Sequence, residues 1–244
     1  KLFNYEIKKH YLYIVMEKGD IDLASFLTSH RAEIDDLFIR FYWAEMLKCV
    51  NLIHKEGIVH LDLKPANFLF VRGTLKLIDF GIASALPSNK TSVLKETQMG
   101  TLSYMAPEVL KATGDGAGRD GDDSKSIFKV NRKADVWSLG CILYNMVYGC
   151  TPYQKFRSVY EKVSAIISSP VNFEPIEDSD LLDVMKRCLE KDPNKRASVD
   201  ELLNHRYVKS KRSTVFDQSV MLKDDDDFLK LAEDLRQRTP RSFA

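Results

Sequence analysis

Three short motifs in a fixed order constrain this chain more than any other feature. They are His60-Leu61-Asp62-Leu63-Lys64-Pro65-Ala66-Asn67, Ile78-Asp79-Phe80-Gly81 and Met105-Ala106-Pro107-Glu108. Each motif is weak when taken alone, because an Asp near a Lys is usually a surface pair and Asp-Phe-Gly is usually a turn. Chance is a poor explanation for all three in this order and spacing, so we expect them to belong to one site.

The first two motifs contain the side chains that phosphoryl transfer needs. Moving a γ-phosphoryl group to a hydroxyl requires a carboxylate that positions the hydroxyl, a cation near the phosphate and hard oxygen ligands for Mg²⁺. Asp62, Lys64, Asn67 and Asp79 supply that set. The sequence therefore favours an enzyme that uses ATP and Mg²⁺.

Composition argues against several other classes of protein. The chain has 244 residues, of which 44% are hydrophobic, enough for one substantial domain with a core. Lys and Arg (36) nearly balance Asp and Glu (35), and the basic runs at 209–212 and 236–241 lack an aromatic platform, so neither nucleic acid nor a membrane is the expected partner. The four cysteines show no metal-binding spacing and are expected to be reduced thiols in an intracellular protein.

Hydrophobic periodicity predicts a mixed α+β chain that is mainly helical. The expected strands are a hairpin at 2–7 and 11–16 and short runs at 58–60, 68–71 and 75–78. The expected helices cover 37–56, 136–148, 159–167, 178–189, 199–203 and 225–238. Irregular segments are expected at 86–100 and in a Gly- and Asp-rich flexible insertion at about 112–128.

The three motifs resemble the catalytic loop, DFG and APE motifs of protein kinases, and the resemblance extends from about residue 1 to 207. It implies an α+β protein-kinase-like fold, mainly the helical C-lobe with a remnant of the N-lobe sheet. Residues 1–17 would form the last two N-lobe strands, 17–22 the hinge and 23–208 the C-lobe. Residues 209–244 would form a tail with a possible helix at 225–238.

The resemblance also implies a role for each motif residue. Asp62 would be the base or orient the attacking hydroxyl, Lys64 would contact phosphate, and Asn67 and Asp79 would bind Mg²⁺. Thr101 would contact Asp62 and Lys64 and help to receive the substrate. The Lys-Pro that follows Asp62-Leu63 is similar to the serine/threonine branch of the family.

Four further residues have structural roles by the same resemblance. His60 would brace the DFG segment. Glu108 would form a buried ion pair with Arg196, and Asp135 would hold the backbone of the catalytic loop.

The segment Ile14–Gly19 resembles the hinge that binds adenine, although its residues alone would predict only a core strand. In that comparison Met16 is the gatekeeper, and Glu17, Lys18 and Gly19 offer backbone groups to adenine. The rest of the nucleotide site would include Asp22 at the ribose, Leu69 as the pocket floor and Ile78 beside the metal ligand.

A finer resemblance is to the TTK (monopolar-spindle) kinases. It rests on Ile21-Asp22-Leu23, Leu75–Ala83, Thr91-Ser92-Val93, Tyr104-Met105 and Asp135–Tyr144, together with the catalytic-loop motif. It implies dual-specificity phosphorylation, mostly on Ser and Thr, in the spindle-assembly checkpoint and chromosome segregation. The implied partners are ATP, protein substrates and kinetochore proteins, at the kinetochore and spindle, in the nucleus or in the cytoplasm.

Leu61 departs from the family pattern, because most kinases carry an Arg there that pairs with a phosphate on the activation loop. Phosphorylation at Thr91, Ser92 or Thr97 is still our hypothesis for activation. The phosphate would then need another cation, for which Lys90 and Lys95 are local candidates.

A second departure is that nothing before Met16 matches a Gly-rich phosphate loop, the strand Lys that binds ATP or its helix Glu. We therefore expect weak turnover from this chain alone. Two interpretations stay open: a piece of a complete kinase, or a kinase fold that serves as a non-catalytic binding scaffold. Retention of Asp62, Lys64, Asn67 and Asp79 favours the first.

Overall fold

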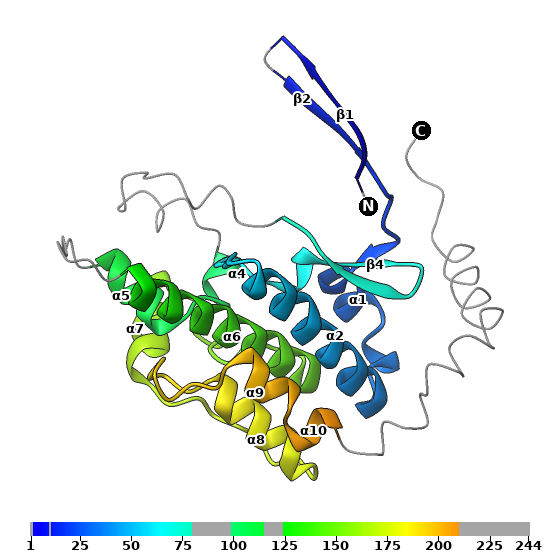
Figure 1. The fold of residues 1–244 in the computed structure, drawn as a ribbon. Helices are drawn as coiled ribbons and strands as arrows, with labels where there is room; N and C mark the ends of the chain where they lie inside the picture. The colour runs from blue at the N-terminus through cyan, green and yellow to red at the C-terminus, as the bar shows by residue number, and fades with distance from the viewer. Residues whose placement is uncertain (1, 10, 80–98, 115–123, 210–244) are drawn as a thin grey trace.

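The computed structural model describes residues 2–9, 11–79, 99–114 and 124–209, and it begins with an isolated hairpin (Figure 1). Strands β1 (Leu2–Lys8) and β2 (Tyr11–Met16) pair in antiparallel fashion, as predicted. The register sets Tyr5 opposite Ile14 and Ile7 opposite Leu12, so one face of the hairpin is continuously apolar. These side chains are exposed, and Figure 1 shows the hairpin extending away from the helices.

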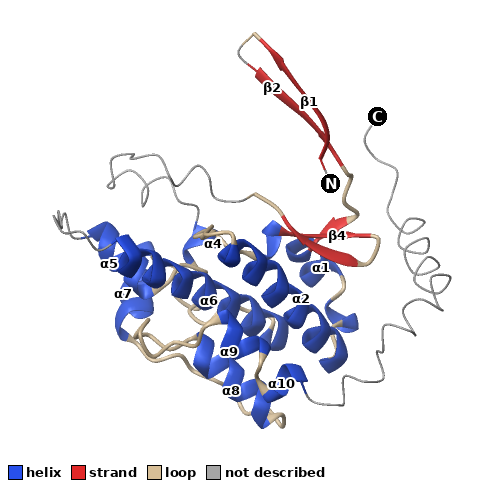
Figure 2. Cartoon of the chain, in the orientation of Figure 1, coloured by secondary structure: helices blue, strands red, loops and turns tan. Residues whose placement is uncertain are grey.

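A second, three-stranded sheet lies against the helical body (Figure 2). Its order is β3 (Ile21–Asp22), β4 (Phe68–Val71) and β5 (Thr74–Leu77), all antiparallel. Arg72 and Gly73 join β4 to β5 with left-handed φ angles of 50° and 75°, as a two-residue hairpin turn requires. The predicted hinge residues lead into β3 of this sheet, and Asp79 follows β5.

The predicted strand at 58–60 is wrong, because these residues form irregular backbone. The N–H of His60 donates to the side chain of Asp135 instead of to a neighbouring strand. The β-branched residues Ile58 and Val59 therefore lead into a loop whose N–H groups donate to a side chain of helix α6.

The rest of the described chain consists of helices and the loops that join them. In order the helices are α1 (Leu23–Ser29), η1 (Arg31–Glu33), α2 (Asp36–Lys55), η2 (Pro65–Asn67), α4 (Met99–Leu102), α5 (Pro107–Gly114), α6 (Ser124–Tyr148), α7 (Val159–Ser168), α8 (Ser179–Cys188), α9 (Val199–Leu203) and α10 (Arg206–Lys209). The helices predicted at 37–56, 159–167, 178–189 and 199–203 are confirmed. None of the helices in the described ranges is long and apolar enough to span a membrane.

Helix α2 follows directly from its sequence. Asp35 caps its start by accepting a hydrogen bond from the Phe38 N–H at 2.7 Å. The residues buried along one face are Ile39, Tyr42, Trp43, Met46, Leu47, Val50 and Ile53, at helical spacing. The left-handed Gly57 (φ 78°) follows the helix end.

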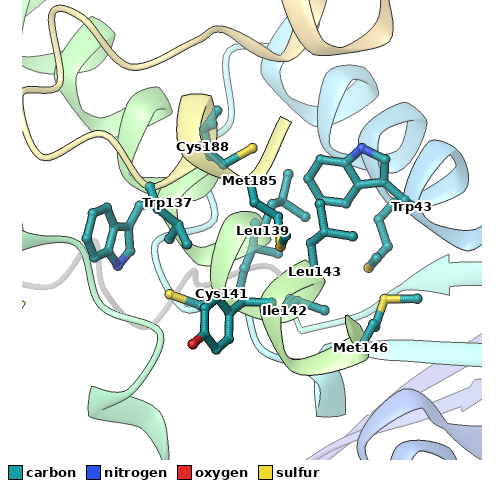
Figure 3. Close-up of a cluster of buried hydrophobic side chains, with 14 of the residues drawn as sticks. Trp43, Trp137, Leu139, Cys141, Ile142, Leu143, Met146, Met185 and Cys188 are labelled. Atoms are coloured by element: carbon teal, nitrogen blue, oxygen red, sulfur yellow. The ribbon is translucent and has the colours of Figure 1, made fainter. Parts of the chain in front are cut away.

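Helix α6 forms the centre of the core, as its apolar sequence predicts. Every residue from Ala134 to Tyr144 is buried, and Figure 3 shows Trp137, Leu139 and Leu143 packed with side chains of α2 and α8. The helix begins at Ser124 and not at the predicted Val136, and 124–135 contains neither Gly nor Pro to interrupt it.

Three predictions lie partly or wholly outside the described residues. The predicted insertion at 112–128 overlaps the end of α5 and the start of α6, and its middle, 115–123, is not described. The helix predicted at 225–238 and the predicted phosphorylation sites Thr91, Ser92 and Thr97 lie wholly outside the described residues.

Candidate active site

The loop that follows α2 is fixed by one buried carboxylate. Asp135, fully buried on α6, accepts the N–H of His60 on Oδ2 at 2.9 Å and the N–H of Leu61 on Oδ1 at 2.8 Å. The predicted role of Asp135 in holding this backbone is confirmed. A buried charge that accepts several hydrogen bonds is strongly oriented, so Asp135 sets the position of Asp62.

His60 connects the loop to the segment that carries Asp79. Its Nε2 donates to the carbonyl of Ile78 at 3.3 Å, and its Nδ1 accepts the N–H of Asp62 at the same distance. These two bonds place the proton on Nε2. The predicted bracing of the segment around Asp79 by His60 is confirmed.

Asp62 and Lys64 lie together at the surface of the loop. The Nζ of Lys64 is 3.0 Å from Oδ2 of Asp62, and both side chains are part-exposed. Leu61, just before them, has a left-handed φ of 63°, which is unusual for a bulky residue and turns the loop sharply. A carboxylate and an ammonium group therefore face solvent side by side, within reach of a substrate.

Asn67 and Asp79 are brought together by the backbone. The carbonyl of Asn67 accepts a hydrogen bond from the N–H of Ile78 at 2.8 Å. Asp79 is the next residue after Ile78, so this bond brings Asp79 close to Asn67. Asp79 has a left-handed φ of 56° and is exposed. Phe80 and Gly81 of the same motif lie outside the described residues.

The side chain of Asn67 fits a role as a metal ligand. Asn67 is 3% exposed, and its Oδ1 is buried without a hydrogen-bond partner in the described part of the chain. Such an orphaned acceptor is costly unless a ligand satisfies it. A carboxamide oxygen and the nearby carboxylate of Asp79 are the hard donors that Mg²⁺ prefers.

The residues predicted to form the hinge contact the second sheet. Glu17 forms an ion pair with Lys76 of β5 at 2.5 Å, and the hydrogen bond from Lys76 lowers the pKa of Glu17 below its ordinary value. Gly19 lies against Leu69 so closely that an added Cβ would be 2.2 Å from Leu69 Cδ2. The structure therefore places the predicted hinge beside the predicted pocket floor.

Asp22 is the cap of α1 as well as a candidate ribose contact. Its carboxylate accepts hydrogen bonds from the N–H and the hydroxyl of Ser25 at 2.9 and 2.7 Å. Burial would raise the pKa of Asp22, but the hydrogen bonds from Ser25 outweigh it and hold the pKa below its ordinary value. Its role at a ribose stays a prediction.

Three predicted site residues are not joined to this cluster by a described contact. Met16 is exposed at the end of β2, and Lys18 is exposed just after it. Thr101 lies part-buried in α4, and its carbonyl accepts the N–H of Tyr104. Within the described ranges Thr101 has no hydrogen bond to Asp62 or Lys64, so that contact also stays a prediction.

The predicted ion pair between Glu108 and Arg196 is confirmed. The two guanidinium nitrogens lie 2.6 and 2.9 Å from the two carboxylate oxygens, and the Arg196 side chain is fully buried. The pair joins the start of α5 to the loop before α9 and so ties two parts of the helical body together.

Sequence reasoning missed His54. Its Nε2 lies 2.7 Å from Oδ2 of Asp135, the same oxygen that accepts the His60 N–H. The available signal was a histidine on the buried face of α2, four residues after Val50 and next to Ile53. His54 thus belongs to the support of the catalytic loop.

The candidate site thus consists of a buried carboxylate beneath a loop, a part-exposed Asp–Lys pair on that loop and two hard-oxygen side chains beside it. The chain belongs to the protein kinase domain family, whose model matches residues 1–208.

Within that family the chain is similar to dual-specificity and serine/threonine kinases of the TTK/MPS1 group. It is 48% identical over 210 residues to the dual specificity protein kinase Ttk of Danio rerio and 47% identical over 210 residues to TTK of Mus musculus. It is 41% identical over 218 residues to the serine/threonine-protein kinase MPS1 of Saccharomyces cerevisiae. Each match covers 85% of this chain, but only 21%, 24% and 28% of the respective relatives.

Proposed function

We propose that the chain acts in transfer of the γ-phosphoryl group of ATP to serine and threonine hydroxyls of proteins, and also to tyrosine. The observation that carries this proposal is the Asp62–Lys64 pair on a loop fixed by Asp135, next to the unsatisfied oxygen of Asn67. The similarity to a dual specificity protein kinase supports including tyrosine hydroxyls among the acceptors.

Each site residue then has a defined task. Asp62 accepts a hydrogen bond from the substrate hydroxyl and takes its proton, while the Lys64 ammonium places positive charge beside the transferred group. Asn67 and Asp79 would hold Mg²⁺, and the backbone of 17–19 would hold adenine. Bound MgATP supplies the phosphoryl group and the cation charge that stabilises its transfer.

The test is phosphate transfer to a generic protein substrate by the chain as its gene encodes it. Asp62→Asn keeps the size of the side chain but removes the base, so kcat should fall about 10²- to 10⁴-fold. Asp200→Asn is the matched control, because Asp200 is exposed on α9, away from the loop. Equal activity of Asp62→Asn and wild type would contradict the proposal.

A binding measurement separates the enzyme from a non-catalytic scaffold. MgATP should raise the melting temperature of wild type, and Asp79→Asn should reduce this shift because a metal ligand is lost. A melting temperature that does not respond to MgATP, together with absent transfer, would favour the scaffold.

For the cellular role we propose action at kinetochores in the spindle-assembly checkpoint and chromosome segregation. The support is the 41–48% identity to the TTK and MPS1 kinases. Cells in which Asp62→Asn replaces the wild-type residue should fail to arrest when microtubules are depolymerised. A normal arrest in those cells would contradict this role.

A further inference from the structure

Lys162 of α7 is a buried cation with a single described partner. The residue is 5% exposed, and its Nζ donates to Oγ of Ser103 at 3.0 Å. No carboxylate lies within ion-pair distance of its Nζ in the described part of the chain. Burial lowers the pKa of Lys162 below its ordinary value. A buried ammonium without a counter-charge is costly, so its contact with Ser103 calls for an explanation.

Ser103 belongs to the segment Leu102–Met105. We name it the receiving segment, because it directly follows Thr101, the residue predicted to help to receive the substrate. Helix α6 holds the next residue of this segment: the hydroxyl of Ser138 donates to the carbonyl of Tyr104 at 2.7 Å, and Nδ2 of Asn145 donates to the Tyr104 hydroxyl at 3.4 Å. Burial raises the pKa of Tyr104 to about 12. One side of the receiving segment is thus fixed by the central helix.

The hydrogen bond from Lys162 to Ser103 links α7 to the receiving segment. The C-terminal end of α7 is anchored elsewhere, since Nζ of Lys191 donates to the carbonyl of Ile166 at 2.5 Å and the hydroxyl of Tyr153 donates to the carbonyl of Ser169 at 2.8 Å. With α7 fixed at that end, the position of Lys162 is set by the fold. Its ammonium therefore holds Ser103 from α7, while α6 holds Tyr104.

We propose that Lys162 is a positioning residue that fixes the receiving segment through Ser103 and thereby sets the affinity for protein substrates. The inference rests on the proposed kinase function and extends it to substrate binding. Asp62 and the nucleotide site are held by α2, α6 and the second sheet, so Lys162 should affect the peptide and leave ATP binding unchanged.

The experiment measures steady-state kinetics with one serine/threonine peptide that wild type phosphorylates with saturation. Lys162→Met keeps most of the apolar stem but removes the donor, and the KM for the peptide should rise about tenfold, with the KM for ATP unchanged within about twofold. Ser103→Ala should produce a similar rise. Since both changes break one contact, the double variant should be no worse than Lys162→Met alone.

Lys155→Met is the matched control, because Lys155 is an exposed lysine in the loop before α7 and its change should leave both KM values as in wild type. If Lys162→Met fails to fold, Ser103→Ala carries the test, with its melting temperature measured first, because the change leaves the buried Lys162 ammonium without its described partner.

An unchanged peptide KM in Ser103→Ala or a folded Lys162→Met would overturn the inference while leaving the kinase function intact. Absence of Asp62-dependent transfer in wild type would instead overturn the proposed function, and this inference with it.

Discussion

At the scale of single residues, the structure separates buried charges from exposed ones. Arg196 donates to both carboxylate oxygens of Glu108 and also to the carbonyls of Glu190 and Lys133. Its guanidinium lies 5.2 Å from the centre of the Trp137 ring. By contrast, Arg187 and Asp183 form an ion pair of similar length, 2.7 Å, on the exposed side of α8.

These two pairs predict very different costs of truncation. Glu108→Ala leaves the buried guanidinium without its counter-charge, and the free energy of unfolding should fall by about 3–5 kcal/mol. Arg187→Ala removes an exposed i,i+4 pair and should cost less than about 1 kcal/mol. Urea denaturation of both variants measures the difference. A loss below about 1 kcal/mol in Glu108→Ala would show that the pair does not stabilise the lobe.

At the scale of elements, periodicity predicted the helices better than the loops. The apolar spacing of α2 and the continuous apolar run of α6 were readable because each helix buries its own pattern. The strand at 58–60 was wrong because its hydrogen-bond partner, Asp135, lies far away in sequence. The same remoteness hid His54, whose partner is also Asp135.

The candidate site was predictable to the extent that it depends on local motifs. Asp62, Lys64, Asn67 and Asp79 follow from the order of the motifs and from the resemblance that they carry. Periodicity and motif matching do not find Lys162, because its significance comes from packing α7 against residues after Thr101. Side chains that act through non-local contacts require the fold.

The contact of Gly19 with β4 gives a prediction at the element scale. Gly19→Ala would place a Cβ 2.2 Å from Leu69 Cδ2 and 2.3 Å from Leu69 Cγ, so the hinge or β4 must shift, at a cost of about 1–3 kcal/mol. Adding Leu69→Ala should recover part of this loss, since it removes the clashing atoms. The measurement is the melting temperature of each variant. Gly100→Ala is the control, because a Cβ added at Gly100 meets no atom within 4 Å. Strictly additive losses in the double variant would rule out the clash.

At the scale of the whole molecule, the hairpin and the helical body differ in how they are held. The apolar face of β1 and β2 is open, with Ile7 at 70% and Tyr5 at 63% exposure. In the body, α2, α6 and α8 bury their side chains against one another (Figure 3). Opening the hairpin therefore exposes little further surface, whereas opening the body exposes the core.

The carboxylate of Asp135 should give the loop at 60–62 the slow amide exchange of a core helix. It accepts the N–H groups of His60 and Leu61 and also contacts His54 of α2, so we expect these N–H groups to meet solvent only when α6 and α2 separate. In native-state deuterium exchange their opening free energy should approach that of global unfolding, while the amides of β1 and β2 exchange through small fluctuations. Rapid exchange at His60 and Leu61 would mean that the loop opens without the core. If their exchange is slow, the position of Asp62 persists for as long as the molecule stays folded.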